Sequence, residues 1–322
     1  MPDRVDRLRV GYIGGTGRSG STLLELILGS LPGFVAVGEL YTIWSEGVVL
    51  DHRCGCGETF HACPFWTRVG ERAFGGWHRL DAEALARLQP PAIGRLRQLP
   101  GLASRRLRGP ELADALENYG ETMATLYEAI AEVGEAQVVI DASKSGGHAF
   151  LLAAVPRIDP RVVHLVRDPR GVAYSWTRRI VRPDVPGGET MLGPRSISRT
   201  DREWLLQNLA PHFLSIFSIP RTLTRYEDLI AEPAAELARI LRFLGEDELA
   251  GEIAERVRGN EFDVTPTHAI AGNPLRFAYG RMRIKADDQW REALSPRTQR
   301  LVLLQTLPLA ARYGYLHRTA SS

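Results

Sequence analysis

The sequence contains few cysteines, little net charge and no long apolar run. Three cysteines occur in 322 residues, and this small, odd number argues against the disulfide framework of a secreted protein. Forty basic and 38 acidic residues give a net charge of +2, which provides no basis for general nucleic-acid binding. No apolar segment is long enough to span a bilayer, so we expect no membrane partner. The N-terminal ten residues lack an apolar signal core, so we expect a cytoplasmic protein.

The three cysteines are clustered, in Cys54-Gly-Cys56 and at Cys63. His52 and His61 fall in the same segment, so three thiolates and one imidazole would suit a small zinc site. The Cys-x-Cys spacing is less typical of zinc sites than Cys-x-x-Cys, however. Free thiols in a tight loop, or one local disulfide, fit the pattern as well. The sequence leaves these alternatives open, and we assign no metal ligand from it.

The apolar runs predict an α/β fold. Five β-rich runs alternate with segments of helical period, as in a parallel sheet with helices on both faces. The predicted strands are Val10–Ile13, Phe34–Val37, Val138–Ile140, Val162–Val166 and Arg221–Tyr226. The predicted helices are Thr22–Leu31, Glu111–Val133, Ser145–Val155, Gly171–Arg178, Ala234–Leu244 and Arg297–Leu307. We expect one domain over residues 1–322, with a cysteine loop and helical cap inserted at about 51–110 and a Pro- and Gly-rich acceptor lid at 182–199.

The most informative motif is GGTGRSGST, Gly14–Thr22, directly after the first predicted strand. A strand, a glycine-rich turn and an apolar helix place backbone N–H groups and a helix N-terminus around an anion. The glycine spacing fits the dinucleotide fingerprint, with Glu39 about 20 residues later as a ribose ligand, which would indicate an NAD(P)-dependent Rossmann oxidoreductase. The spacing also fits an ATP-type loop, but Ser21 stands where the phosphate-binding lysine is required, which disfavours an ATPase or kinase.

A second anion site is predicted by VVHLVRDPRGVAYSW, residues 162–176. Arg167 ends a hydrophobic strand, and Ser175 follows about two helical turns later. Pro169 suits the start of the intervening helix. An arginine and a hydroxyl converging at this point would bind a phosphate. A structural arginine–aspartate pair, with Ser175 as a packing residue, is the alternative.

Together these two motifs resemble those of the sulfotransferases that use 3′-phosphoadenosine-5′-phosphosulfate (PAPS). RYEDL at Arg225–Leu229 and the basic loop GNPLR at Gly272–Arg276 look like those of bacterial members. The resemblance implies a single α/β domain with a central parallel sheet flanked by helices, similar to P-loop nucleotide kinases, with helical insertions. It also implies PAPS as the donor and no metal requirement. The cofactor-binding residues that it implies are Gly17, Arg18, Ser19, Gly20, Ser21, Thr22, Arg167, Ser175, Asn273 and Arg276.

Glu39, Lys144 and Arg18 are the candidate catalytic residues. Glu39 follows the second strand, at the sheet edge where α/β proteins bind ligands, and is the candidate general base for an acceptor hydroxyl. Family members with carbohydrate or protein-tyrosine acceptors are similar in using a glutamate in this region. Lys144, in DASKS after the third strand, and Arg18 would stabilise the transferring sulfuryl group. We therefore predict a PAPS-dependent sulfotransferase.

The acceptor is defined less closely than the donor. We expect a small molecule, glycan or natural product over the strand ends, near Tyr41 and Trp44. His148 is the alternative base, His164 is expected in the core, and His268 is placed to contact the cofactor. The sequence identifies neither the acceptor nor the oligomeric state. A nucleotide-binding module without catalysis is the non-enzymatic alternative.

Overall fold

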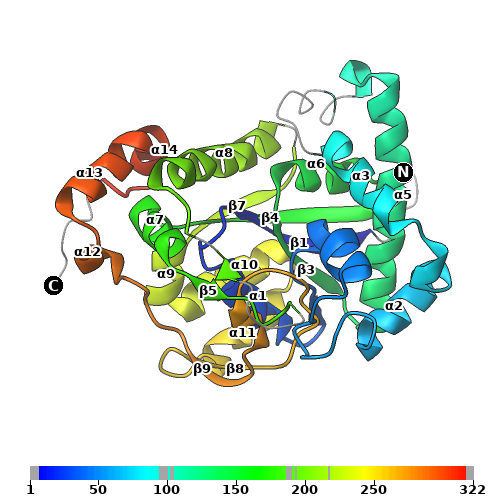
Figure 1. Ribbon diagram of the computed structural model, residues 1–322. Coiled ribbons are helices and arrows are strands. Elements are labelled where there is room, and N and C mark those ends of the chain that lie inside the picture. The colour runs from blue at the N-terminus through cyan, green and yellow to red at the C-terminus, as the bar shows by residue number, and fades with distance from the viewer. Residues whose placement is uncertain are drawn as a thin grey trace.

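A five-stranded parallel sheet in the order β2-β3-β1-β4-β7 forms the centre of the protein (Figure 1). The computed structural model describes residues 7–93, 101, 105–185, 191–192, 194–216 and 218–316. The strands are β1 (Leu8–Gly15), β2 (Phe34–Ala36), β3 (Val138–Lys144), β4 (Ile158–Val166) and β7 (Arg221–Arg225). Each of these strands coincides with a predicted one, so the α/β fold class is confirmed.

Helices cover both faces of the sheet (Figure 1). One face packs against α1 (Ser21–Gly29) and α10 (Pro233–Leu244), with α9 (Tyr226–Ala231) and α11 (Asp247–Arg256) beside them. The other packs against α5 (Pro110–Val133), α6 (Gly146–Ala154) and α8 (Ile197–Ile216). The remaining helices are α2 (Pro64–Phe74), α3 (Ala82–Ile93), α7 (Pro169–Thr177), α12 (Trp290–Ala293), α13 (Pro296–Gln305) and α14 (Leu307–Arg312). None of the helices in the described ranges has the length and apolar character needed to cross a bilayer.

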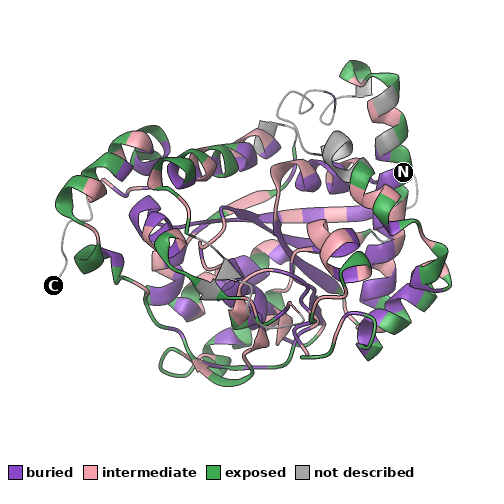
Figure 2. Ribbon diagram, in the orientation of Figure 1, coloured by how far each residue is buried: buried purple, intermediate pink, exposed green. Residues whose placement is uncertain are grey.

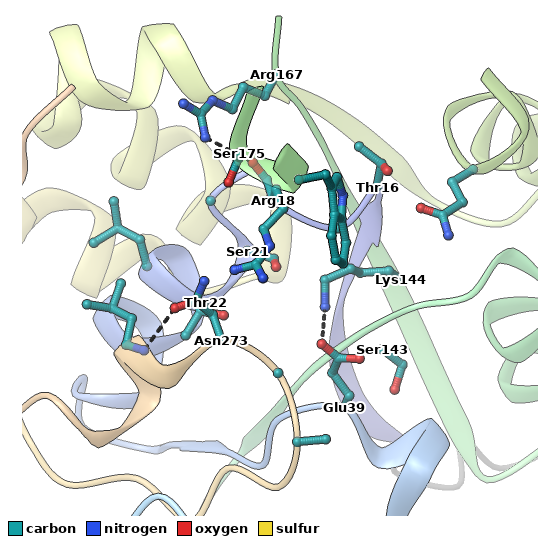
Figure 3. Close-up of a pocket in the computed structure, with 18 of the residues that line it drawn as sticks. Thr16, Arg18, Ser21, Thr22, Glu39, Ser143, Lys144, Arg167, Ser175 and Asn273 are labelled. Atoms are coloured by element: carbon teal, nitrogen blue, oxygen red, sulfur yellow. Dashed lines mark hydrogen bonds and ion pairs between the residues drawn. The ribbon is translucent and has the colours of Figure 1, made fainter. Parts of the chain in front are cut away.

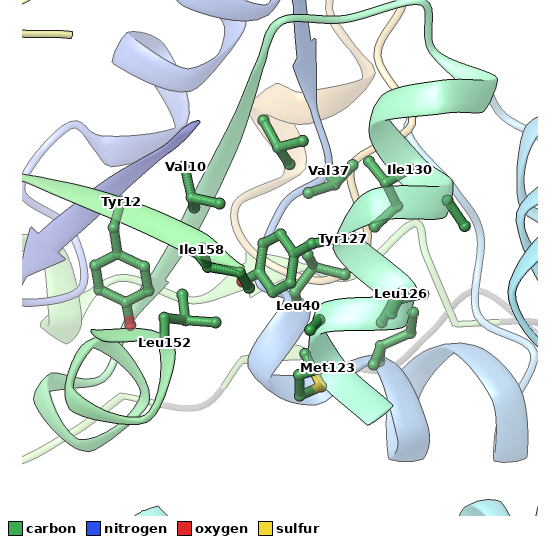
Figure 4. Close-up of a cluster of buried hydrophobic side chains, with 14 of the residues drawn as sticks. Val10, Tyr12, Val37, Leu40, Met123, Leu126, Tyr127, Ile130, Leu152 and Ile158 are labelled. Carbon is green, nitrogen blue, oxygen red and sulfur yellow. The ribbon is translucent and has the colours of Figure 1, made fainter. Parts of the chain in front are cut away.

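The central strands are buried on both sides (Figure 2). Successive side chains of a strand point to opposite faces. Val10 and Tyr12 therefore pack with Tyr127 and Leu152 beneath α5 and α6 (Figure 4), whereas Ile13 lies in the cluster beneath α1 and α10. Burial on both faces gives a strand a continuous apolar sequence, which is why these strands are recognisable in the sequence.

The strand order determines where a ligand binds. β1 lies between β3 and β4, and ligands of open α/β sheets bind at the carboxyl ends of strands where the order reverses. A Rossmann dinucleotide fold places its second strand next to its first. Here β3 separates β2 from β1, so the chain does not have the Rossmann fold on which the NAD(P)-dependent alternative rests.

Three segments in which no strand or helix was predicted contain short regular elements. The range 51–66 includes the start of α2 at Pro64, and 259–289 contains the hairpin of β8 (Glu261–Val264) and β9 (Gly280–Arg283). The range 182–199 contains β6 (Met191–Leu192), which pairs with β5 (Ile180–Val181), and the start of α8. Residues 186–190 and 193 of the predicted lid, and 94–100 and 102–104 of the predicted cap, lie outside the described residues.

Candidate functional site

A large pocket opens at the carboxyl ends of β1, β3 and β4 (Figure 3). Its volume is about 1330 Å³, whereas pockets for one small ligand hold about 300–1,000 Å³. The cavity is therefore large enough for two substrates. Ten of the predicted site residues line it: Gly17, Arg18, Gly20, Ser21, Thr22, Glu39, Lys144, Arg167, Ser175 and Asn273.

The glycine-rich loop presents an uncapped helix N-terminus to this pocket. Gly20 is the N-cap of α1 with φ +92°, and no side chain of the described residues caps the helix. The first turn also carries no acidic residue. The N–H groups of Ser21 and Thr22 and the positive end of the helix dipole are thus available to an anion.

Arg18 extends from the same loop beside a second arginine. The guanidinium groups of Arg18 and Arg195 lie 4.7 and 3.6 Å from the ring centroid of Trp176. Burial, and then the charge of Arg195, lower the pKa of Arg18. Two cations in such proximity favour occupation of the space between them by an anionic ligand.

The second predicted anion site belongs to the same cavity. Arg167 is only 5% exposed and directly follows β4. Its guanidinium donates to the carbonyl of Arg18 at 3.1 Å, pairs with the carboxylate of Asp287 at 3.2 Å and lies over the ring of Tyr226. Ser175, on α7, lines the pocket near it. The arginine is thus held in place while part of its donor set faces the cavity.

The neighbouring Asp168 does not pair with Arg167. It caps α7 and forms a two-pronged ion pair with Arg170, at 2.9 and 2.7 Å. The structural arginine–aspartate pair considered from the sequence therefore exists, but its arginine is Arg170. This arrangement leaves Arg167 directed to the pocket.

Tyr226 of the RYEDL motif connects the two anion sites. Its ring occupies the space beside Gly20, where a Cβ would lie 2.6 Å from it, and it supports the guanidinium of Arg167. The following Glu227 accepts hydrogen bonds from the backbone N–H of Asp168 and the hydroxyl of Tyr315. The RYEDL motif therefore holds the glycine-rich loop in position relative to the end of β4.

Glu39 and Lys144 form an ion pair at the floor of the pocket (Figure 3). Lys144 Nζ lies 2.6 Å from Glu39 Oε1 and also donates to the carbonyl of Ala142. Their side chains are 27% and 12% exposed, so a ligand can reach both. Lys144 adopts φ +65°, a strained conformation that suggests a functional constraint. A carboxylate and an ammonium group are thus adjacent beside the anion sites.

The segment with Asn273 forms the wall next to Glu39. Its backbone joins the end of β2: Glu39 N–H donates to Ile270, and Ile270 N–H donates to Val37, each at 3.0 Å. A Cβ at Gly272 would lie 3.3 Å from Glu39 Oε1. This close approach brings the C-terminal part of the chain to the sheet edge that carries Glu39.

Two predicted cofactor-binding residues do not line the pocket. The Oγ of Ser19 is buried and has no partner among the described residues. Arg276 is 1% exposed, and its guanidinium bonds to the carbonyls of Gly272 and Arg53 and pairs with Asp184 at 3.4 Å. Arg276 therefore supports the wall of the pocket from behind, because two backbone carbonyls and the buried carboxylate of Asp184 use its donors.

The three histidines considered from the sequence lie away from the pocket lining. His148 is fully buried, and burial lowers its pKa to about 3, so its position does not favour it as the alternative base. His164 lies in the core as expected, with Asn208 and Arg221 on its ring nitrogens. His268 faces the cysteines rather than the cofactor site.

Other pocket residues were not singled out in the sequence analysis. They include Thr16, Ser143, Trp176, Arg182, Arg195, Tyr226, Arg283 and Lys285. Trp44, expected near the acceptor, is instead buried against Tyr119. In the sequence, the basic composition of residues 281–285 is the one signal that could have identified Arg283 and Lys285 as site residues.

Comparison with known proteins identifies the family. Residues 12–249, more than half of the chain, match the model described as "Sulfotransferase family". The chain belongs to the sulfotransferase family. No curated protein sequence matches this sulfotransferase.

This sulfotransferase is similar to solved structures from other proteins. The sulfotransferase domain of the Synechococcus PCC 7002 olefin synthase aligns with a TM-score of 0.51 and 20% identity, over 98% of this chain and 97% of that one. A sulfotransferase domain from the curacin biosynthetic pathway gives 0.48 and 18%, over 94% and 98%. A Mycobacterium tuberculosis H37Rv sulfotransferase gives 0.43 and 15%, over 94% and 77%.

Proposed function

We propose that this sulfotransferase transfers a sulfuryl group from PAPS to a hydroxyl of a small molecule, glycan or natural product. The observation that carries the proposal is that the glycine-rich loop and the Arg167–Ser175 site line one pocket. A bisphosphate nucleotide has two anionic ends, and a single cavity with two anion sites suits it. The remaining volume accommodates an acceptor.

The donor contacts follow from the positions of the cationic groups. Gly17, Gly20 and the first turn of α1 would bind the 5′-phosphosulfate through backbone N–H groups, with Arg18 beside them. Arg167 and Ser175 would bind the 3′-phosphate. Arg283 and Lys285 add positive charge to the same lining, and Asn273 lies near the loop. Arg276 would act by holding Gly272 in position.

The chemistry requires one proton transfer and stabilisation of one leaving group. The acceptor oxygen forms a bond to sulfur, and the bond between sulfur and the 5′-phosphate oxygen breaks, leaving its electron pair on that oxygen. Glu39 would accept the proton of the acceptor hydroxyl. Lys144, 2.6 Å from Glu39, and Arg18 would stabilise charge on the sulfuryl and phosphate oxygens. These fixed charges suit a transfer without a metal ion.

Calorimetric titration with adenosine 3′,5′-bisphosphate, ATP, NAD and NADP tests the donor. We expect the bisphosphate to bind at least about 100-fold more tightly than NAD, since only the bisphosphate satisfies both anion sites. No binding of the bisphosphate at millimolar concentration would refute the proposal.

Transfer is then tested with PAPS carrying labelled sulfate and a panel of phenols, sugars and polyketide alcohols. A labelled product, absent with Glu39→Gln, supports the catalytic proposal. Tight bisphosphate binding without any labelled product across the panel would favour the non-catalytic module.

A further inference from the structure

The three cysteines and one histidine form a cluster outside the pocket lining. One ligand atom from each of Cys54, Cys56, Cys63 and His268 lies within 4.8 Å of every other. Cys54 and Cys63 are buried, whereas Cys56 and His268 are half-buried. The cluster joins the loop before α2 to a segment some 200 residues later in the chain.

The spacing of these atoms is that of a tetrahedral zinc site. The Sγ atoms of Cys56 and Cys63 are 3.6 Å apart, and Nδ1 of His268 lies 3.7 and 3.4 Å from Sγ of Cys54 and Cys63. Zinc bonds of about 2.3 Å to sulfur and about 2.0 Å to nitrogen place tetrahedral ligands about 3.8 Å (S to S) and about 3.5 Å (S to N) apart. The observed separations match both values.

The backbone around the cluster is fitted to this arrangement. Cys54 N–H donates to Glu58, and Gly57 N–H donates to Cys54, which folds the cysteine segment into a tight turn. A Cβ at Gly55 would lie 2.8 Å from the carbonyl of Thr267, so the turn requires glycine there to approach the histidine segment.

The imidazole of His268 is held in a fixed orientation. Phe65 stacks on its ring, with centroids 4.3 Å apart and planes 3° from parallel. Trp66 Nε1 donates to the His268 carbonyl at 3.0 Å. A ring held in this way presents Nδ1 to the thiols, as a metal ligand must.

The histidines of the cysteine segment itself point elsewhere. His52 pairs with Glu46 at 2.6 Å, and the Nε2 of His61 faces the carbonyl of Val48. The imidazole expected from the neighbouring sequence is thus supplied from the other end of the chain.

A second group of potential ligands is neutralised by arginine. Glu46, His52 and Asp184 also lie close together. Arg182 pairs with both carboxylates, and Arg276 pairs with Asp184, so cations already satisfy this group. Within the described part of the chain, no arginine or lysine hydrogen-bonds to the three thiols or to the ring of His268.

We propose that Cys54, Cys56, Cys63 and His268 bind one structural Zn²⁺ ion. Three thiols lose their protons to solvent on binding, and the neutral imidazole coordinates through Nδ1. Four protein ligands leave no open position, so the ion joins chain segments and takes no part in sulfuryl transfer. It fixes the segment that continues into Ile270 and Gly272 beside Glu39.

Elemental analysis of the reduced full-length protein tests the proposal directly. We expect one zinc per chain after purification without chelator, and uptake of one Co²⁺ by the metal-free protein with the intense visible bands of tetrahedral thiolate coordination. Neither measurement depends on a variant that has to fold. A reduced protein without zinc that gives no cobalt spectrum would overturn the proposal. Isolation with Cys56 and Cys63 in a disulfide, two hydrogens lighter by mass, would do the same.

Substitutions test the ligand set. We expect His268→Ala to lower zinc affinity by more than the roughly 100-fold that loss of an outer-shell partner costs, and to change the cobalt spectrum. His61→Ala is the matched control, because His61 lies in the cysteine segment but its ring faces the carbonyl of Val48. This variant should keep one zinc per chain. Full zinc affinity and an unaltered cobalt spectrum in His268→Ala would show that the fourth ligand is wrong.

Hydrogen exchange gives a further readout in the wild-type protein. Removal of the metal should accelerate exchange at the amide of Ile270, which bonds to Val37, and leave the amide of Val163 in the central sheet protected. If the amide of Ile270 exchanged equally slowly with and without zinc, the proposal that the ion joins these chain segments would be contradicted.

Discussion

Replacement of Arg167 by alanine offers a sharp test of the two-anion pocket. The guanidinium is almost fully buried, so its contacts with a ligand are screened little by water. Two of its donors are occupied by the carbonyls of Arg18 and Asp287, which leaves the others for a ligand. The substitution should weaken only ligands that carry a phosphate at the 3′ position.

The expected magnitude follows from these contacts. A hydrogen bond to a charged group contributes about 1.5–3 kcal/mol, and a guanidinium can make two such bonds to one phosphate. The carboxylate of Asp287, 3.2 Å away, already offsets part of the positive charge. We therefore expect a loss of about 2–3 kcal/mol, which corresponds to about 30- to 150-fold in Kd.

Calorimetry with two ligands separates this effect from general damage to the pocket. Adenosine 3′,5′-bisphosphate should bind about 30- to 150-fold more weakly to Arg167→Ala, whereas adenosine 5′-monophosphate should change less than about 3-fold. Arg161→Ala is the charge-matched control, because Arg161 lies on β4, the strand that Arg167 directly follows, and pairs with Asp159 and the carbonyl of Phe243. Equal weakening of both ligands by Arg167→Ala would refute the assignment of this arginine to the 3′-phosphate.

Three other substitutions probe the base, the buried acid behind it and the loop. Glu39→Gln should lower kcat by about 10²–10⁴-fold and leave donor affinity unchanged. Glu46 is another pocket carboxylate, paired with an arginine, and Glu46→Gln should lower kcat less than about 10-fold. Equal losses of kcat in the two variants would contradict the role of Glu39 as the base. Burial raises the pKa of Glu25 to about 8, so the carboxyl is protonated in the folded state and ionises more readily when unfolded. The stabilisation from the protonated carboxyl is complete below about pH 4.5 and declines as the pH rises to about 8. Between pH 5 and 8 the free energy of unfolding in urea should therefore fall by on the order of 3 kcal/mol less in Glu25→Gln than in the wild type. The same pH profile in both proteins would contradict the raised pKa of Glu25. In Gly20→Ala, a residue with positive φ gains a Cβ 2.6 Å from the ring of Tyr226, and we expect a loss of about 3 kcal/mol of stability. Gly280→Ala is the control: its φ is similar, but no atom lies within 4 Å of the added Cβ, and we expect a loss of about 1 kcal/mol. Equal melting temperatures of the two glycine variants would show that the packing at Gly20 is loose.

The sheet and both anion-binding motifs are predictable because their signals are local. The strands are apolar over their full length, since helices bury both faces. The anion sites depend on short motifs in which a strand, a turn and a helix are consecutive in the chain. The contact of Arg167 with the carbonyl of Arg18 then follows from neighbouring parallel strands.

The remainder of the site depends on contacts between distant segments. Residues 267–276 run beside the end of β2, and no periodicity in that stretch indicates it. This placement directs Arg276 away from the ligand and His268 toward the cysteines. The sequence indicates which residue types are suited to bind anions and metals, but the partner of each depends on the tertiary fold.

The junction of Gly38 and Ile270 is formed by main-chain groups alone. Gly38 has φ +81°, and a Cβ there would lie 2.1 Å from the carbonyl of Ile270, so this position tolerates only glycine. The partner segment, by contrast, contributes N–H and C=O groups that any residue possesses. The side chain that the next turn adds to the pocket lining at Leu275 can therefore vary while this main-chain junction stays intact. In evolution and in engineering alike, Leu275 is thus a position where the pocket can be adapted to new acceptors.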